Sequence, residues 1–241
     1  MLSPDPSLVL QFERAGGLDF EAERFEAVSS EGTTGSELHV WRQSACLVVP
    51  RAYARRDGIE AAVKAVTALG WPVFFRASGG SCVFHGSNVL CMTQLFCEPR
   101  GTAGLDETYH RFTSHLIATA HAFGISGVQV GTAPDAPCDG RFNLLVEGRK
   151  LAGTAMRRRA RAGMETTLVH ACLWLSGPLA PALHAVETFE ALLGIGKPYP
   201  PAACISLAEA AKRPWDPPGN LAMDWARAMT DLVGTTYSTD A

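Results

Sequence analysis

Residues 76–85 have the types and spacing of a ligand cradle. They read Arg-Ala-Ser-Gly-Gly-Ser-Cys-Val-Phe-His, so an arginine ends one predicted strand and a histidine closes the next. The loop between them has only small side chains, and a ligand could lie directly on its backbone amides. Arg76 could hold a carboxylate or a phosphate through two parallel hydrogen bonds. A tight hairpin that binds nothing explains the same residues equally well, and the spacing is not that of a Walker loop.

A lysine follows a second tight turn. The turn Glu147-Gly148 separates two apolar runs, and Lys150 lies just past it. Glycine tolerates the positive φ that a two-residue hairpin turn requires. The small residues 153–155 (Gly-Thr-Ala) would let a substrate approach the strand closely. Lys150 could then polarise a carbonyl group or pair with a carboxylate or phosphate. The alternative is a solvated lysine on a strand edge, where it discourages aggregation.

Positive charge is concentrated between residues 149 and 161. This stretch holds six lysines and arginines and no acidic residue, in a chain of formal net charge −3. Such a patch would suit an acidic protein partner or a phosphate-bearing ligand. A charged, solvated hairpin arm explains it equally well. The charge of the whole chain argues against a general nucleic-acid binder, which normally has a broadly basic surface.

The seven cysteines do not form a recognisable framework. Their number is odd and their spacing irregular, unlike the disulfide pattern of a small secreted domain. No CxxC pair and no HExxH motif occurs, so no zinc site is predicted. Most of the thiols lie in apolar runs such as 45–49 and 89–92, which is typical of small, buried, reduced residues. Cys138 differs because the polar, turn-forming residues 135–140 around it predict an accessible loop.

These segments must be positioned by both helices and strands, which indicates an α+β fold with a mixed or antiparallel β-sheet packed with helices. Apolar spacing predicts helices over 20–28, 58–69, 106–123, 181–193 and 223–233, with Asp57 and Asp106 as the N-caps of the second and third. Alternating or short apolar runs predict strands over 37–42, 46–49, 73–76, 82–85, 89–96, 128–130, 142–146, 149–156 and 167–175.

The 241 residues suffice for one main domain with a substantial core. We expect an irregular N-terminal arm over 1–19, the main domain over 20–210 and a C-terminal helical appendage over 211–241. No run approaches the ~20 apolar residues of a transmembrane helix. The first residues lack the basic and apolar regions of a signal peptide, so a cytoplasmic location is expected.

Together the motifs resemble the lipoate–protein ligase and octanoyltransferase family, which shares its catalytic fold with biotin–protein ligases. The family's Arg-x-Ser-Gly-Gly loop, ending in Val-(aromatic)-His, is matched by residues 76–85, and its Gly-Arg-Lys hairpin by 148–155. His170 falls where many members carry a histidine on the following strand. The resemblance extends from about residue 20 to 210. It implies a biotin/lipoyl protein ligase-like catalytic fold, with both motifs side by side in one sheet and lining a single apolar tunnel.

The chain departs from the ATP-dependent branch of this family. Phe142 and Asn143 stand where those ligases typically have Asn-Asp after Gly-Arg, which argues against nucleotide use. Cys138, twelve residues before Lys150, begins a Cys-x-Gly-x-(aromatic)-x-Leu loop similar to that of the Cys/Lys amidotransferase branch. This likeness implies an acyl-thioester on Cys138, since a thiolate is a strong nucleophile and its thioester still reacts with amines. The alternative is an idle loop thiol.

The resemblance therefore implies an acyltransferase that moves an octanoyl or lipoyl group through a cysteine thioester to a lysine of a lipoyl-domain protein. The implied partners are E2 subunits and the glycine-cleavage H protein, with acyl carrier protein as a further candidate donor and neither nucleic acid nor membrane. A transferase would need no cofactor. An ATP-dependent lipoate ligase using ATP and Mg is the alternative, and a non-catalytic acyl-binding relative is the third.

The same resemblance assigns roles to individual residues. Cys138 and Lys150 are the expected catalytic residues, and no metal ligand is expected. The expected substrate-binding residues are Arg76, Ser78, Gly79, Gly80, Ser81, Val83, His85, Gly153, Thr154, Ala155 and His170.

Overall fold

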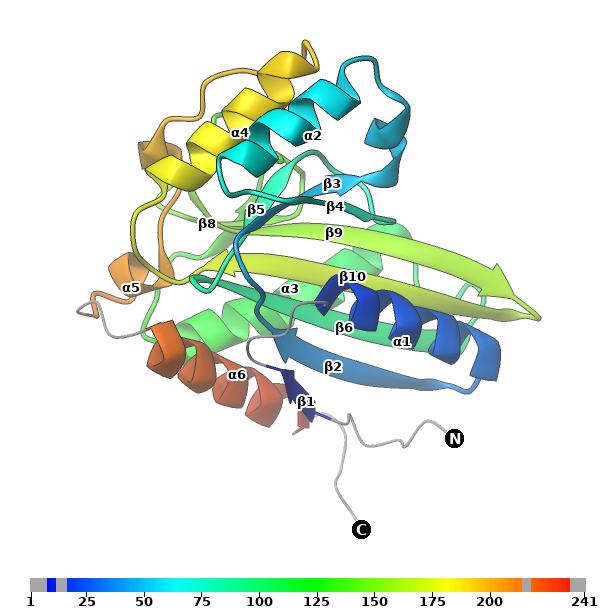
Figure 1. The fold of residues 1–241 in the computed structure, drawn as a ribbon. Coiled ribbons are helices and arrows are strands. Elements are labelled where there is room, and N and C mark those ends of the chain that lie inside the picture. Colours follow the sequence, from blue (N-terminus) through cyan, green and yellow to red (C-terminus); the bar gives the residue numbers. More distant parts are fainter. Residues whose placement is uncertain (1–7, 12–16, 214–217, 235–241) are drawn as a thin grey trace.

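The computed structural model describes residues 8–11, 17–213 and 218–234, which fold around two β-sheets (Figure 1). The large sheet has the strand order β1-β2-β6-β10-β9-β8-β7 and the small sheet the order β4-β3-β5. The strands are β1 (Leu8–Gln11), β2 (Gly35–Trp41), β3 (Cys46–Pro50), β4 (Val73–Arg76), β5 (Val83–His85), β6 (Val89–Pro99), β7 (Gln129–Gly131), β8 (Asn143–Val146), β9 (Arg149–Arg161) and β10 (Met164–Trp174).

Helices cover the outer faces of both sheets. They are α1 (Gly17–Glu31), α2 (Ile59–Ala68), α3 (Leu105–Ala122), α4 (Ala180–Leu192), the short α5 (Leu207–Ala210) and α6 (Pro218–Gly234), with 3-10 turns at Arg51–Arg55 and Pro201–Ala203. Figure 1 shows α3 and α6 on one side of the large sheet, with the small sheet, α2 and α4 on the other. The predicted α+β class with mixed and antiparallel pairing is confirmed.

Side chains of β6 point alternately to two hydrophobic cores, one on each face of the large sheet. Leu90, Met92 and Phe96 face the side of α3 and α6, where Trp225 of α6 is fully buried. Leu95 faces the other way and packs against α1. Because successive side chains of a strand point to opposite faces, the intervening residues of β6 and β10 face α1 and the small sheet.

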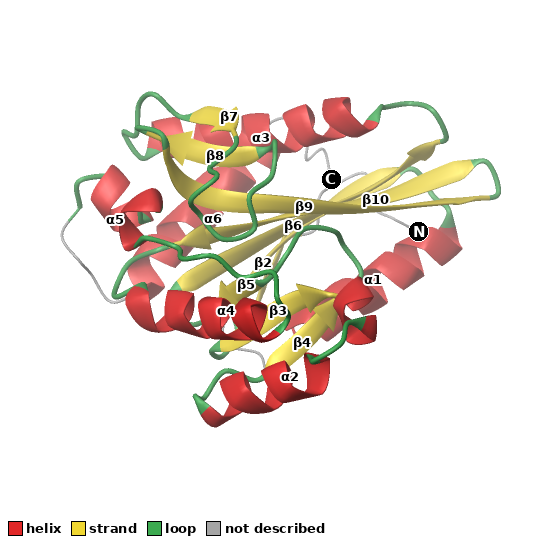
Figure 2. Cartoon of the chain, turned by 90° about the horizontal axis from the view of Figure 1, so that it is seen from above, coloured by secondary structure: helices red, strands yellow, loops and turns green. Residues whose placement is uncertain are grey.

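The predicted placement of the two motifs in one sheet is wrong. The strand β5, which ends the loop motif, pairs with β3 of the small sheet, whereas Lys150 is the second residue of β9 in the large sheet. The long strands β9 and β10 run through the middle of the large sheet and end in a hairpin at one side of the molecule (Figure 2). The two motifs therefore come from different sheets.

Several local predictions need correction. The N-caps are Gly58 for α2 and Gly104 for α3 in place of the two aspartates, and Gly58 has a left-handed φ of 78°. The segment expected to be an irregular arm contains β1, which pairs in parallel with β2, and the start of α1. In the segment expected to be an appendage, α6 packs against α3 and is part of the core. The domain limits themselves stay a prediction.

Candidate active site

An open cavity separates the two sheets and is lined by both sequence motifs. Its empty volume, including the open mouth, is about 760 Å³, and its wall is mostly apolar. Nine of the predicted site residues line it: Arg76, Val83, His85, Cys138, Lys150, Gly153, Thr154, Ala155 and His170. Most pockets that bind small molecules have this size and an apolar wall with a few convergent polar groups. The other four predicted residues, 78–81, lie behind this wall and contact its members, as the next paragraphs show.

The thiol of Cys138 lies against the small-residue loop. Its Sγ accepts a hydrogen bond from the Ser81 N–H at 3.2 Å and lies 3.9 Å from Nη2 of Arg76. Cys138 is half-buried and has a φ of 51°, in the left-handed region that non-glycine residues rarely adopt. Such backbone conformations persist where the surroundings impose them, and they are frequent in active sites. The loop therefore holds the sulfur in a fixed position at the cavity wall.

Gly80 allows this close approach. A Cβ at this position would lie 2.7 Å from Cys138 Sγ and 2.9 Å from Arg76 Nη2, and the φ of 96° is itself unfavourable for other residues. The neighbouring Gly79 has nothing within 4 Å of such an atom. Only the second glycine of the pair is thus required by contact with the thiol.

Lys150 is buried and holds the loop that carries the cysteine. Its Nζ donates to the carbonyl oxygens of Pro137 at 2.6 Å and Cys138 at 2.8 Å, and the residue is 9% exposed. A Cβ at Gly153 would lie 3.0 Å from Cε and Nζ of this lysine, so the small residue gives the lysine room. These contacts rule out the solvated edge lysine that the sequence left open.

The guanidinium of Arg76 is hydrogen-bonded to backbone carbonyl groups of the protein. It donates to the carbonyl oxygens of Val48 at 2.6 Å, Gly79 at 2.8 Å and Ser81 at 2.7 Å. The side chain is buried and fixes the shape of the loop. This arrangement differs from the predicted bidentate binding of a substrate anion, because the guanidinium already has carbonyl partners.

His170 belongs to a buried network that sequence reasoning missed. Its Nδ1 lies 2.8 Å from Oε1 of Glu21 on α1, and its Nε2 lies 3.0 Å from Oγ of Ser78. Thr93 Oγ1 donates to the same carboxylate oxygen at 2.6 Å. Burial lowers the pKa of His170, but the charge and hydrogen bond of Glu21 outweigh burial and raise it overall. Burial raises the pKa of Glu21, but the charge and hydrogen bond of His170 outweigh burial, so the pKa of Glu21 is lowered overall.

Glu21 left a signal in the sequence. It shares the buried face of α1 with Phe25 and Val28, at positions i, i+4 and i+7. A carboxylate on an apolar helical stripe needs a partner when buried, because an unpaired buried charge is costly. The stripe could have indicated that Glu21 has a polar partner on the element packed against α1, although not which residue this is.

The cysteines divide as predicted, with one exception. Burial raises the pKa of the Cys46 thiol to about 12 and raises those of Cys82 and Cys204. Cys172 instead is half-buried and lines the cavity. Its hydrogen bond with Cys91 lowers its pKa, against the effect of burial. Cys172 therefore differs from the buried, reduced thiols that the apolar runs predict.

The basic run of the β9–β10 hairpin is paired within the chain. Arg157 and Arg159 both contact Glu26 of α1, and Arg158 contacts Glu165 of β10. Likewise, Arg149 pairs with Glu209 of α5. These four ion pairs neutralise much of the charge that suggested an anionic partner, so the structure favours the charged hairpin arm.

The described lining of the cavity carries no carboxylate, and its lysine and arginine already have protein partners. Mg²⁺ is usually held by carboxylates together with phosphate oxygens, and no aspartate or glutamate is among the described residues that line the cavity. Both cations that could bind phosphate, Arg76 and Lys150, donate to loop carbonyls.

This fold and cavity define a catalytic domain of the lipoate–protein ligase type. A solved structure of lipoate-protein ligase A bound with ATP aligns with a TM-score of 0.64 at 14% identity, covering 95% of this chain and 85% of that one. The sequence matches the lipoyl protein ligase A/B catalytic domain over residues 16–216. The chain belongs to this family. Membership confirms the predicted resemblance and fold, and it confirms the prediction of an enzyme without deciding between a transferase and a ligase.

Two proteins of known sequence are similar to this chain. An uncharacterized protein of Cupriavidus necator is 32% identical over 198 residues, which are 76% of this chain and 76% of that protein. The octanoyl-[GcvH]:protein N-octanoyltransferase of Geobacillus kaustophilus is 26% identical over 146 residues, 61% of this chain. The chain spans half the length of that Geobacillus relative. Over the described ranges, no helix is both long and apolar enough to cross a membrane.

Proposed function

We propose that this enzyme is an acyltransferase that moves an octanoyl or lipoyl group to a lysine of a lipoyl-domain protein through a thioester on Cys138. The observation that carries the proposal is the position of the Cys138 sulfur. It lies at the wall of an apolar cavity, with the Ser81 N–H directed at it. An acyl chain held in such a cavity gains roughly 0.8 kcal/mol per buried methylene.

In the first half-reaction the Cys138 thiolate attacks the carbonyl carbon of the acyl donor. When the donor is an acylated lysine, the new C–S bond forms and the C–N bond breaks. The thiol proton ends on the departing lysine amine. Hydrogen bonds from charged groups and backbone N–H groups stabilise a thiolate, and the Ser81 N–H and Arg76 guanidinium are placed to do so.

In the second half-reaction the neutral amine of an acceptor lysine attacks the thioester carbonyl. The C–N bond forms, the C–S bond breaks and the amine proton returns to the sulfur, so the enzyme is regenerated. Both steps pass through an oxyanion beside the sulfur. Preorganised N–H donors aimed at such an oxyanion contribute strongly to catalysis. The Ser81 N–H, 3.2 Å from the sulfur, is a candidate donor.

Lys150 acts in this proposal by holding the cysteine loop. Its ammonium binds the carbonyl oxygen of Cys138 itself, so it fixes the backbone on which the nucleophile is mounted. The same charge lies in the cavity wall, where it favours the negative charge that develops on the substrate.

The glycine-cleavage H protein is the donor that we propose first. The Geobacillus relative bears the name of an octanoyl-[GcvH]:protein N-octanoyltransferase, and that activity fits an amide donor and a lysine acceptor. An acyl carrier protein donor has no such support. The E2 subunits proposed as acceptors and a cytoplasmic location are carried over from the sequence resemblance.

An ATP-dependent lipoate ligase is the second candidate. The ATP-bound lipoate-protein ligase A shares the fold. Its requirement for nucleotide finds little support in this cavity, since the described lining carries no carboxylate for Mg²⁺. The two readings differ in the need for ATP and in the covalent intermediate.

Intact-mass analysis tests the proposal. The enzyme is incubated separately with octanoyl-H protein, with octanoyl-acyl carrier protein, and with octanoate plus ATP. We expect one octanoyl mass on the enzyme with octanoyl-H protein, removed by neutral hydroxylamine and mapped to Cys138. The Cys138→Ser variant should lose the adduct, because an alkoxide forms far less readily than a thiolate near neutral pH.

A matched control replaces Cys97, a buried thiol packed against α1 and remote from the cavity lining. The Cys97→Ala variant should keep the adduct. Acylation of Cys172, which also lines the cavity, would contradict the assigned nucleophile. Pyrophosphate release from octanoate and ATP, with full activity in Cys138→Ser, would establish the ligase reading. Failure of every donor to modify a lipoyl domain would favour a non-catalytic acyl-binding protein.

A further inference from the structure

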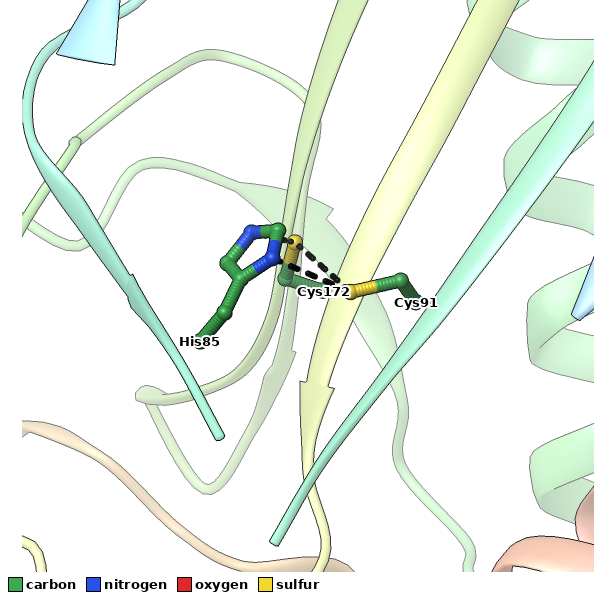
Figure 3. A group of neighbouring side chains, drawn as sticks. All are labelled: His85, Cys91 and Cys172. Carbon is green, nitrogen blue, oxygen red and sulfur yellow. Dashed lines mark hydrogen bonds between the residues drawn. The ribbon is translucent and has the colours of Figure 1, made fainter. Parts of the chain in front are cut away.

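Two thiols and an imidazole meet at the inner end of the cavity wall (Figure 3). Cys91 lies on β6, Cys172 on β10 and His85 at the end of β5, so the group joins both sheets. The two sulfurs are 3.8 Å apart. The Cys91 sulfur lies 3.5 Å from His85 Nδ1, and the Cys172 sulfur lies 3.2 Å from His85 Nε2.

We propose that His85, Cys91 and Cys172 form a binding site for a thiophilic divalent cation, and that zinc is the ion that fits it best. The fourth coordination position of the bound ion opens into the cavity. The proposal does not depend on the acyltransferase reaction.

The spacing of the donors matches a tetrahedral site. Zn–S bonds of about 2.3 Å and Zn–N bonds of about 2.0–2.1 Å place two sulfurs about 3.8 Å apart and sulfur and nitrogen about 3.6 Å apart. The observed sulfur–sulfur distance is 3.8 Å, and one ligand atom from each residue lies within 4.8 Å of the other two. The longest edge must therefore shorten by no more than about 1.2 Å to reach the zinc geometry, which a small side-chain rotation supplies.

The charge of the group suits a divalent ion in a buried place. Two thiolates and a neutral imidazole bring a charge of −2, which a divalent cation cancels. A neutral cluster avoids the cost of an uncompensated charge in an apolar environment. Cys91 is 2% exposed and His85 4% exposed, so the balance matters here. Soft thiolate donors also select zinc over the harder Mg²⁺ and Ca²⁺.

Gln43 is placed to give His85 the outer support that metal-bound histidines usually have. Its amide nitrogen lies 2.9 Å from His85 Nδ1 and 2.9 Å from Cys46 Sγ. A ligating histidine almost always gives its other N–H to an acceptor, which fixes the ring. The oxygen and nitrogen of an amide side chain are interchangeable in shape. With the amide turned so that its oxygen faces the ring, Gln43 accepts a hydrogen bond from Nδ1–H. Nε2 of His85 is then left to bind the metal.

The fourth position faces the space that an acyl chain would use. His85 and Cys172 line the cavity, whereas Cys91 lies behind them and is absent from its lining. Zinc sites with three protein ligands keep one position open for water or a substrate group. A bound cation would place a polar ligand at the apolar wall, so metal and acyl chain should compete for the cavity.

The main competing arrangement is a disulfide. Cys91 and Cys172 are directly opposed in the antiparallel β6–β10 register. Their sulfurs are nevertheless farther apart than the 2.03–2.05 Å of a disulfide bond, and both cysteines are free in the structure. Reduced thiols at this distance are suitable as metal ligands.

Cobalt spectroscopy on the full chain tests the site. The protein is freed of metal with a chelator under reducing conditions, then titrated with Co²⁺ and back-titrated with Zn²⁺, without any acyl donor. We expect one Co²⁺ per chain, with a thiolate-to-cobalt charge-transfer band that Zn²⁺ abolishes. Because a ligand is lost, Cys91→Ala and Cys172→Ala should each remove the band and weaken Zn²⁺ binding by more than the roughly 10–100-fold that loss of an outer-shell partner costs.

Cys97→Ala is the matched control, since this thiol lies on the same strand as Cys91 but packs under α1. It should bind cobalt as the parent protein does. Absence of the band from the parent protein would overturn the proposal, whatever the variants do. An unchanged band in Cys91→Ala would place the metal elsewhere. A Cys91–Cys172 disulfide in protein purified without reductant, together with no metal binding after that disulfide is reduced, would also overturn it. None of these outcomes depends on the thioester assay for Cys138.

Discussion

Lys150 binds the backbone of Cys138, the other residue that the resemblance predicts to be catalytic. Its ammonium donates to the Cys138 carbonyl oxygen at 2.8 Å and to the preceding carbonyl oxygen at 2.6 Å. The sulfur of Cys138 instead has the N–H of Ser81 as its close partner. The lysine and the loop motif thus hold opposite sides of the same residue, from the large sheet and the small sheet respectively.

Replacing Lys150 should therefore affect both the reaction and the loop. We expect Lys150→Ala to abolish nearly all octanoyl transfer and to lower the free energy of unfolding by about 1–3 kcal/mol, because two carbonyl oxygens lose a buried donor. Lys150→Arg should not restore activity, since a planar guanidinium cannot replace a compact ammonium between the two carbonyl oxygens. Single-turnover transfer and urea unfolding measure the two effects. Near-normal transfer by Lys150→Ala would show that the lysine has no part in the reaction.

The two glycines of the loop should respond differently to the same change. In Gly80→Ala the new methyl group would lie 2.7 Å from Cys138 Sγ, so the sulfur must move. A displacement of this kind can cost about 100-fold in rate. Gly79→Ala meets nothing within 4 Å and serves as the matched control. The rate of Cys138 acylation, followed by intact mass, checks the pair. Equal rates in both variants would mean that the thiol position does not limit the reaction.

The sequence could predict the two motifs, because both are local patterns of residue type, and the resemblance they carry implied an apolar tunnel lined by both. It could not predict which sheet each motif joins. Residues 83–85 alternate like any short strand, and nothing in that alternation distinguishes a partner in β3 from one in β9. For the same reason, the sequence could not predict that Cys91 and Cys172 are neighbours. They are 81 residues apart in the chain but lie opposite one another in the sheet.

Side-chain partners were equally hidden. The arginines after residue 156 indicated a patch of free charge, but their acids come from α1 and β10. The carboxylate of Glu21 reaches His170 across 149 residues of sequence. Helix spacing could have placed Glu21 on a buried face, but only the packing of α1 on the sheet decides which residue Glu21 contacts.

The His170–Glu21 pair should make stability depend on pH. The raised pKa of His170 contributes stability that is present below its ordinary pKa and is lost as pH rises through the raised value. The lowered pKa of Glu21 contributes stability that is present above its ordinary pKa and is lost as pH falls through the lowered value. The pair is therefore most stabilising between these two pKa values, and its contribution falls on either side.

Glu21→Gln should remove the alkaline part of this dependence, because His170 then loses the charge that raises its pKa. Urea unfolding from about pH 6 to 9 should show a falling free energy for the parent protein and a flatter curve for the variant. Glu26→Gln, on the same helix but exposed, is the control and should keep the parent curve shape. A parent curve without any fall in this range would contradict the pairing.

The last prediction concerns α6, which the sequence placed in a C-terminal appendage. Trp225 is fully buried, its ring centroid lies 5.2 Å from that of Phe123, and its Nε1–H points to the sulfur of Met92 at 3.0 Å. Removing a buried tryptophan side chain typically costs about 3–5 kcal/mol. Trp225→Ala should therefore lower the free energy of unfolding of the whole domain by about that amount, in one cooperative transition. Arg227→Ala, on the exposed side of the same helix, should change it by less than about 0.5 kcal/mol. Urea unfolding should be followed by circular dichroism and by labelling of the buried thiol of Cys82. If α6 is part of the domain, both signals change in one transition. If α6 were a separate appendage, it would unfold alone and Cys82 would stay protected from labelling.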